Sequence, residues 1–195
     1  FIPNPSDSSF ETLKNYNKNC NMDVFFALSH GVHRGTLKSG KFDDRALFVR
    51  KLIDKTKNVK FDVYGIDKVQ PIWADHYFKT IANAKMGLNL SRGEAIKYYS
   101  SDRITQIVGN GLVCLIDEKT KYRDFFNNSE MVFYKNENDL SEKILKISRD
   151  EKLRKSIGKN GKLKYMKYFN STQVADFIIG KTLDIKSNKK FFWHN

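Results

Sequence analysis

The sequence predicts a doubly wound α/β fold, with helices on both faces of a mainly parallel, Rossmann-like sheet and further helices at the C-terminus. Three observations favour this fold. Short apolar runs alternate along the chain with segments of helical periodicity. The apolar runs are hydrophobic almost throughout, as in strands that are covered on both faces. Pro3, Pro5 and Pro71 all lie outside the expected helices, whose interiors proline would break.

Five short apolar runs are the expected strands. The second, Val59–Tyr64, alternates apolar with polar residues and then stops at Gly65, a pattern typical of a strand that ends in a turn. The other four are Asp23–Leu28, Met86–Leu90, Leu112–Ile116 and Met131–Tyr134.

The segments between and after these strands have apolar residues at helical spacing. Asp43 and Asp44 suit the positive end of the first helix, and Gly109-Asn110-Gly111 is a strong helix stop. The expected helices are Asp43–Lys55, His76–Ala84, Ser101–Val108, one marked by Leu140, Ile144 and Ile147, one from Leu153 to about Phe169, and one marked by Val174, Phe177 and Ile178.

The organisation we expect has three parts. Residues 1–22 form a linker from an N-terminal domain outside this chain, residues 23–170 form the Rossmann-like domain, and residues 171–195 form a last helix and a basic tail. The stretch 151–195 holds eleven basic and three acidic residues, so +8 of the formal charge of +13 lies there. Such charge suits nucleic acid, an anionic membrane surface or another polyanion, but it is more often typical of an ordinary solvated helix face.

The sequence also bears on the cellular compartment. No apolar run approaches the ~20 residues of a membrane-spanning helix, so we expect no transmembrane segment. The first residues lack the basic head and apolar stretch of a signal peptide. Cys20 and Cys114 are far apart, and we expect them to be reduced thiols in a cytoplasmic protein.

A first candidate ligand site follows the first expected strand, where Ser29–Lys41 combines glycines with basic side chains. Ligands of open α/β sheets bind beyond the carboxyl ends of the strands. Gly31 lets the backbone approach a ligand closely, and Arg34 and Lys38 carry charges that suit a diphosphate. A flexible basic loop fits the same residues equally well.

A second candidate site follows the third expected strand, where Tyr99, Ser100 and Ser101 lead into a helix. The free N–H groups at a helix N-terminus attract anions, although a serine there more often caps the helix. Arg103 in the first turn opposes the helix dipole, which favours an anionic partner. Gln106, one turn later, suits either a ribose or solvent.

The sequence gives little support for a metal site or for other ligand-binding residues. The histidines show no metal-ligand spacing with Cys or carboxylates, so we expect no metal site. Trp73 and the run Phe191–Trp193 could bind a sugar or a base, or could pack against a neighbour.

Residues 89–117 resemble the donor-site pattern of the CgeB-like (spore-maturation-protein-like) glycosyltransferases, a GT-B group. That pattern is a strand ending in Leu-Asn, a variable loop, R-x-x-E-x-x-x-x-G and an apolar strand. Arg103 matches the arginine and Gly111 the glycine, whereas Gln106 stands in place of the usual glutamate. Further similarity, at Phe1–Asp7 and near the C-terminus, extends the resemblance over nearly the whole chain.

The resemblance implies a C-terminal domain that binds a nucleoside diphosphate sugar as donor substrate, with no tightly bound cofactor. The enzyme would be a hexosyl-type glycosyltransferase that acts on a glycan or another hydroxyl acceptor. The acceptor site would lie in the N-terminal domain, so this chain alone would bind the donor and turn over slowly or not at all. The backbone N–H groups of Tyr99, Ser100 and Ser101 would bind the diphosphate.

The same resemblance implies roles for five further residues. Arg34 and Lys38 would neutralise the charge of the leaving group, and Gln106 would bind the ribose. Gly65 and Ile66 would lie beside the base. A glutamine accepts a hydrogen bond less strongly than a glutamate, by roughly 1 kcal/mol, which weakens donor binding without removing the pocket.

Two other functions stay open on the sequence alone. The basic tail is compatible with a nucleic-acid-binding module, although no recognition motif accompanies it. The replacement at Gln106 is compatible with a degenerate transferase-like domain that serves protein contacts.

Overall fold

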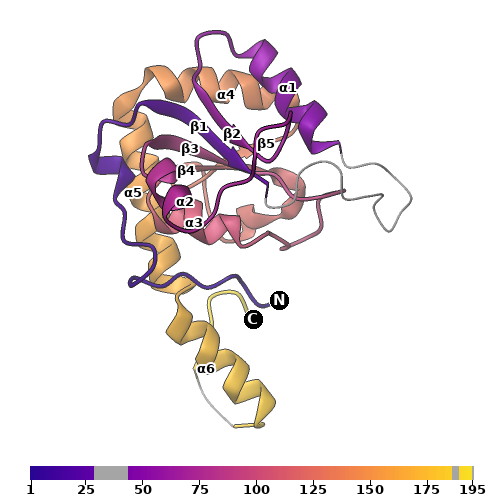
Figure 1. Cartoon of the computed structure of the whole chain (residues 1–195). Coiled ribbons are helices and arrows are strands. Elements are labelled where there is room, and N and C mark those ends of the chain that lie inside the picture. The colour runs from indigo at the N-terminus through magenta and orange to yellow at the C-terminus, as the bar shows by residue number, and fades with distance from the viewer. Residues whose placement is uncertain (29–43, 186–188, 195) are drawn as a thin grey trace.

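The computed structural model describes residues 1–28, 44–185 and 189–194. Its centre is a five-stranded sheet in the order β2-β1-β3-β4-β5, in which every neighbouring pair of strands is parallel. Figure 1 shows helices on both faces of this sheet. The predicted doubly wound α/β fold is therefore confirmed.

The strands are short and apolar because both of their faces are covered. In β1, Val24 and Phe26 face one core cluster and Phe25 faces the other, and all three are fully buried. Each such burial contributes about 1.5–3 kcal/mol. The strands are β1 (Met22–Ala27), β2 (Phe61–Tyr64), β3 (Ala84–Asn89), β4 (Val113–Asp117) and β5 (Val132–Tyr134).

Two pairs of helices cover the two faces. On one face, α1 (Arg45–Lys55) and α4 (Glu137–Arg149) bury their apolar sides against the strands. On the other face, α2 (Ala74–Ile81) and α3 (Arg103–Gly109) do the same, as Figure 1 shows. The long helix α5 (Glu151–Tyr168) contributes side chains to both clusters, and α6 (Ser171–Thr182) follows it.

The strand order fixes where a ligand can bind. The chain leaves β1 for β2 on one side of the sheet and returns to place β3 on the other side of β1. The carboxyl ends of β1 and β3 therefore flank the topological switch point, where doubly wound folds bind their ligands.

Several predicted boundaries lie one to three residues from the observed ones, and the following two are examples. The helix expected at His76–Ala84 ends at Ile81, and β3 already begins at Ala84. The helix expected to begin at Ser101 begins at Arg103. Ala84 belongs to β3 instead of the helix, where it is completely buried. Its carbonyl accepts a hydrogen bond from the side-chain amide of Asn15, a residue distant in the sequence.

The predicted stop after α3 is confirmed. The helix ends at Gly109, and Gly111 has φ +78°, a left-handed conformation that favours glycine. The Gly111 amide donates to the Val108 carbonyl, and the Leu112 amide donates to the Ile107 carbonyl. This pair of bonds is a Schellman motif, and it directs the chain from α3 straight into β4.

The first residues of the chain pack between the C-terminal helices and the sheet. Ser6 pairs with the junction of α5 and α6, because its amide donates to the Phe169 carbonyl and its own carbonyl accepts from the Ser171 amide. The Tyr165 hydroxyl donates to the Asn4 carbonyl at 2.8 Å. Figure 1 shows this N-terminal segment running beside the α5–α6 junction.

A carboxylate at this junction should make stability depend on pH. Asp7 accepts hydrogen bonds from the Ser171 hydroxyl and from Ser9, and these bonds lower its pKa from the usual 3.8 to about 2. A lowered pKa in the folded state means stabilisation that is present above about pH 4 and is lost as the pH falls through 2. We expect the difference in melting temperature between wild type and Asp7→Asn to shrink over that range.

Thermal unfolding followed by circular dichroism between pH 6 and pH 2 measures this difference. Asp54→Asn, at an exposed position of α1, is the matched control. A melting-temperature difference for Asp7→Asn that is the same at pH 6 and pH 2 would contradict the assignment.

Candidate functional site

A cleft opens at the topological switch point, over the carboxyl end of β1 and between the first turns of α2 and α3. Its volume is about 410 Å³, within the ~300–1,000 Å³ range of small-molecule sites. One wall comes from the start of α3 and the other from α2 and the segment before it. The lining residues are Ala27, Leu28, Ile72, Trp73, Ala74, Tyr77, Phe78, Ser101, Asp102, Arg103 and Gln106.

Arg103 spans the switch point. One guanidinium nitrogen, Nη2, donates to the Ala27 carbonyl at the end of β1 at 3.0 Å. The other, Nη1, donates to the Leu90 carbonyl just beyond β3 at 3.2 Å and to the Ser101 hydroxyl at 3.1 Å. The guanidinium also lies 5.1 Å from the ring centroid of Phe26. The group is therefore held in one place by both strands that flank the cleft.

Arg103 has no ion-pair partner among the described residues, although the nearby Asp102 carboxylate attracts its charge through space. All its hydrogen-bond partners are neutral oxygens, and it forms no ion pair with a carboxylate among residues 1–28, 44–185 and 189–194. Burial lowers the pKa of its guanidinium, yet an arginine keeps its proton at neutral pH. A fixed, unpaired cation at the edge of a cleft attracts an anion, and a guanidinium suits phosphate oxygens best.

The chain leading into α3 supplies further donors. The amides of Ser101, Asp102 and Arg103 donate no hydrogen bond to any described residue. Amides that point away from protein acceptors are available to an anion or to water. They lie next to the guanidinium in the sequence and belong to the same wall of the cleft.

Gln106 lies one turn further along the same wall. Its Nε2 donates to the Asp102 carboxylate at 3.0 Å, across one helical turn. This bond orients the amide and leaves its carbonyl oxygen as an acceptor for a ligand hydroxyl. Asp102 thus positions Gln106. Their i, i+4 spacing in the sequence is the signal from which this contact could have been predicted.

Ser100 has a different environment from the one expected of a ligand-binding serine. It is only 7% exposed, its hydroxyl accepts a hydrogen bond from the Asn89 amide at 2.8 Å, and its carbonyl accepts from the Asn4 amide at 2.9 Å. These bonds join the end of β3 and the N-terminal segment to the residues before α3. Ser100 therefore holds the loop that presents Ser101 and Arg103.

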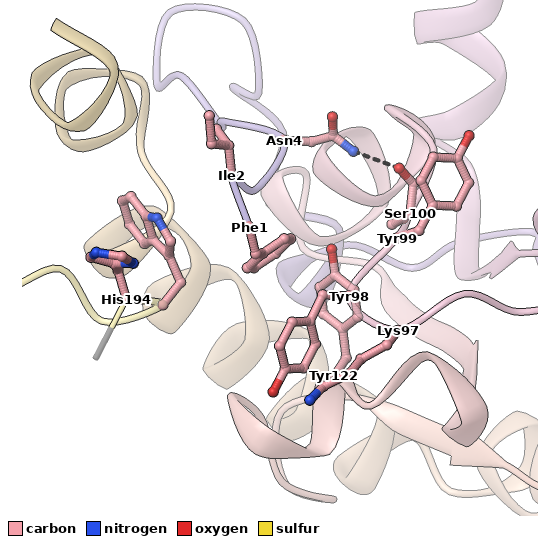
Figure 2. A pocket seen from close by; sticks show the side chains of 10 residues that line it. Phe1, Ile2, Asn4, Lys97, Tyr98, Tyr99, Ser100, Tyr122 and His194 are labelled. Carbon is pink, nitrogen blue, oxygen red and sulfur yellow. Dashed lines mark hydrogen bonds between the residues drawn. The ribbon is translucent and has the colours of Figure 1, made fainter. Parts of the chain in front are cut away.

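Tyr99 and Ser100 line a second cavity, of about 760 Å³, on the other side of this loop. Figure 2 shows Tyr99 and Ser100 on one side of it and His194 on the other, with Phe1 and Ile2 between them. The structure thus brings Ser101, Arg103 and Gln106 together in one cleft and places Tyr99 and Ser100 on its neighbour.

Gly65 and Ile66 lie at the end of β2. Gly65 has φ +79°, and a Cβ there would lie 2.2 Å from the Leu28 carbonyl oxygen, so this position requires glycine. Ile66 is 4% exposed and belongs to the core cluster beneath α1. Neither residue lines the switch-point cleft.

The remaining predicted residues, Gly31, Arg34 and Lys38, lie outside the described residues. Their segment follows directly after Leu28, which lines the cleft. Sequence reasoning did not place the aromatic wall made by Trp73, Tyr77 and Phe78, although it named Trp73 as a candidate. The i, i+4 and i, i+5 spacing of these three aromatics was the available signal.

The described residues contain neither a cluster of metal-binding side chains nor a membrane-spanning helix. No group of three or more His, Cys, Asp or Glu side chains there is arranged to hold a metal ion. None of the helices in that part of the chain has the length and hydropathy required to span a bilayer.

Comparison with solved structures shows the same fold at low identity. The chain is similar to TarM, with a TM-score of 0.60 and 12% identity over 84% of this chain and 35% of that one. It is also similar to S. aureus TarM in complex with fondaparinux, alpha-GlcNAc-glycerol and UDP, with a TM-score of 0.58 and 12% identity over 84% and 36%. For sucrose-phosphate synthase from Thermosynechococcus elongatus, the TM-score is 0.55, at 12% identity over 93% and 49%.

These likenesses identify the fold as the Rossmann-like domain of the GT-B type, and the chain spans a third to a half of the length of those proteins. No curated protein sequence matches the chain. A family described as glycosyl transferase-like matches residues 45–180. Because this match covers more than half of the chain, the protein belongs to the glycosyl transferase-like family.

Proposed function

We propose that this chain is the donor-binding domain of a glycosyltransferase, and that the diphosphate of a nucleoside diphosphate sugar binds beside Arg103. One observation carries the proposal. A guanidinium is fixed by the carbonyls of Ala27 and Leu90 at the switch point, and no carboxylate of the described residues forms an ion pair with it. Family membership makes a sugar donor the natural source of that anion.

The rest of the polar wall supports the same ligand. The free amides of Ser101, Asp102 and Arg103 suit the non-bridging oxygens of a phosphate. The carbonyl oxygen of Gln106, oriented by Asp102, suits a ribose hydroxyl. Anion donors and a hydroxyl acceptor on one wall fit a nucleoside diphosphate better than they fit a free phosphate.

The reaction that such a site promotes is a displacement at the anomeric carbon. The acceptor hydroxyl oxygen forms a bond to that carbon, the bond from the carbon to the diphosphate oxygen breaks, and the acceptor proton passes to a base. Negative charge develops on the departing diphosphate, where the fixed cation of Arg103 stabilises it. We assign Arg34 and Lys38, from the segment that follows Leu28 in the sequence, to the same leaving-group charge.

The finer features of the proposal come from the resemblance to CgeB-like enzymes. They are a hexosyl donor, a glycan or another hydroxyl acceptor, and an acceptor site in an N-terminal domain beyond this chain. The complex of TarM with UDP and alpha-GlcNAc-glycerol is in keeping with partners of this kind. Under this proposal the chain binds its donor without the rest of the enzyme but does not complete the transfer alone.

Calorimetric titration of the wild-type chain with UDP, GDP and inorganic pyrophosphate tests the proposed function. We expect saturable binding of at least one nucleoside diphosphate at moderate salt, and weaker binding of pyrophosphate. A random single-stranded oligonucleotide is the comparison, because nucleic-acid binding falls steeply with salt. Steeply salt-dependent oligonucleotide binding, with no response to either nucleotide, would instead favour a nucleic-acid-binding module.

A further inference from the structure

The switch-point cleft has two chemically different walls. One wall carries Ser101, Arg103 and Gln106, which offer a cation, free amides and a hydroxyl acceptor. The opposite wall, from α2 and the segment before it, is apolar and largely aromatic. Its residues are Ile72, Trp73, Tyr77 and Phe78.

Trp73 is the most exposed member of the aromatic wall. Its side chain is 60% exposed, and no aromatic ring of the described residues stacks on it. Tyr77, in contrast, packs edge-on against Phe25 at 5.3 Å, and Phe78 packs against Tyr77 at 6.3 Å. The indole of Trp73 therefore offers a ligand in the cleft the largest uncovered ring of this wall.

The backbone places this indole at the mouth of the cleft. Trp73 is extended, with φ −142° and ψ 168°, and it occupies the N-cap position of α2 without a side-chain capping hydrogen bond. The next residue, Ala74, has φ +48°, an uncommon conformation for a residue other than glycine. Such conformations persist where the surrounding structure requires them, often at ligand-binding sites.

We propose that Trp73 stacks on the base of the donor nucleotide, while the diphosphate lies beside Arg103 and the ribose beside Gln106. This inference rests on the proposed function and adds the subsite for the base. A base suits the aromatic wall better than a sugar does. The hydroxyls of a sugar buried against Ile72 and Phe78 would lack hydrogen-bond partners, whereas a base offers a flat face and can keep its polar edge in water.

The proposal moves the base from the position that the sequence suggests. From the sequence, the base was expected beside Gly65 and Ile66, but Ile66 is buried in the core beneath α1. Trp73, Arg103 and Gln106 line one and the same cleft, so one nucleotide can reach all three. The structure thus unites the base, the ribose and the diphosphate at the switch point.

The composition of the chain offers a direct reporter for this contact. Trp73 and Trp193 are its two tryptophans, and Trp193 is only 6% exposed among Phe169 and Phe177. In a Trp193→Phe background, tryptophan fluorescence therefore comes from Trp73 alone. We expect UDP or GDP to quench it saturably and inorganic pyrophosphate to leave it almost unchanged.

Calorimetric titration of Trp73→Ala measures what the stack contributes. We expect its affinity for UDP or GDP to fall at least about fivefold, since stacking on one base is worth about 1–3 kcal/mol. Affinity for inorganic pyrophosphate should stay as in wild type. Trp73→Phe, which keeps a ring, should lose less affinity for UDP or GDP. Phe10→Ala, at an exposed aromatic residue elsewhere, should bind them as wild type does.

Three outcomes would overturn the inference. If Trp73→Ala binds UDP and GDP as wild type does while Arg103→Ala does not, the base lies elsewhere and the proposed function stands. If Trp73→Ala weakens only the sugar-carrying nucleotide, such as UDP-glucose, then Trp73 contacts the sugar. If wild type binds neither nucleotide nor pyrophosphate, the proposed function fails as well. Unchanged melting of the Trp73 variants confirms that each comparison is made on folded protein.

Discussion

Arg103→Ala is expected to weaken the binding of nucleoside diphosphates to this chain by roughly 30-fold or more. The guanidinium is the unpaired cation of the switch-point cleft, and Ala27 and Leu90 hold it in place. Removing one partner of a buried, hydrogen-bonded charge pair costs about 2–5 kcal/mol, which corresponds to a loss of roughly 30-fold or more in affinity. Titration calorimetry with UDP and GDP measures this loss directly.

Arg103→Lys shows how much of the affinity depends on the positive charge alone and how much on the shape of the guanidinium. A lysine keeps the positive charge but has one donor group, which cannot bridge the carbonyls of Ala27 and Leu90 and still face a phosphate. We expect the lysine variant to recover only part of the affinity. Arg149→Ala, at an exposed position in the last turn of α4, is the control for a general loss of positive charge.

Equal affinity of Arg103→Ala and wild type would remove the main support for the proposed function. A loss of affinity in Arg149→Ala as large as that in Arg103→Ala would instead indicate non-specific attraction by the net charge of +13. Thermal unfolding of each variant without ligand shows whether the loss of the Arg103 hydrogen bonds has also changed the fold.

The second large expected effect is a loss of folding stability on substitution of Arg154. This side chain is completely buried, and it donates to the Asn15 carbonyl at 2.7 Å and to the Lys18 carbonyl at 2.9 Å. It also pairs with Glu151 within the first turn of α5. Arg154 thus connects α5 to the short 3₁₀ helix Asn15–Asn17 that precedes β1.

Arg154→Ala removes the guanidinium donor from the Asn15 and Lys18 carbonyls, leaving the Lys18 amide on the Asn15 carbonyl, and creates a cavity between α5 and the segment before β1. We expect a loss of about 3–5 kcal/mol in the free energy of unfolding, because a large buried side chain and its hydrogen bonds to two carbonyls are removed together. For a chain of this length, that loss corresponds to a fall in melting temperature of roughly 6–20 °C. Calorimetry or circular dichroism measures it.

Lys155→Ala is the matched control, because Lys155 contacts the same Glu151 at 3.6 Å from a partly exposed position. An exposed ion pair contributes at most about 1 kcal/mol, so this variant should melt close to wild type. Equal melting temperatures for Arg154→Ala and Lys155→Ala would show that the buried hydrogen bonds to Asn15 and Lys18 do not stabilise the fold as proposed.

The repeating elements of the fold could be predicted because their signals are local. The apolar runs at β1 and β4 and the Gly109-Asn110-Gly111 stop depend on neighbours a few residues away. The boundary between α2 and β3 could not be predicted, because Asn15, almost seventy residues earlier, hydrogen-bonds the carbonyls of Ile81 and Ala84. Local periodicity carries no information about such a partner.

The residues of the candidate site also differ in whether local sequence signals could identify them. The sequence selected Ser101, Arg103 and Gln106, because a basic residue in the first turn of a helix favours an anion. It could not separate them from Ser100, whose hydroxyl and carbonyl are occupied by Asn89 and Asn4. It also gave no reason to place an aromatic wall opposite Arg103.

The sequence by itself therefore determined the fold class, the number of strands and the segment that carries the candidate site, since these depend on composition and short-range spacing. Only the tertiary structure decided the strand order, the switch point and the partners of Arg103. Those features depend on contacts such as the one between Arg103 and the Ala27 carbonyl, 76 residues apart, which form only when the sheet assembles.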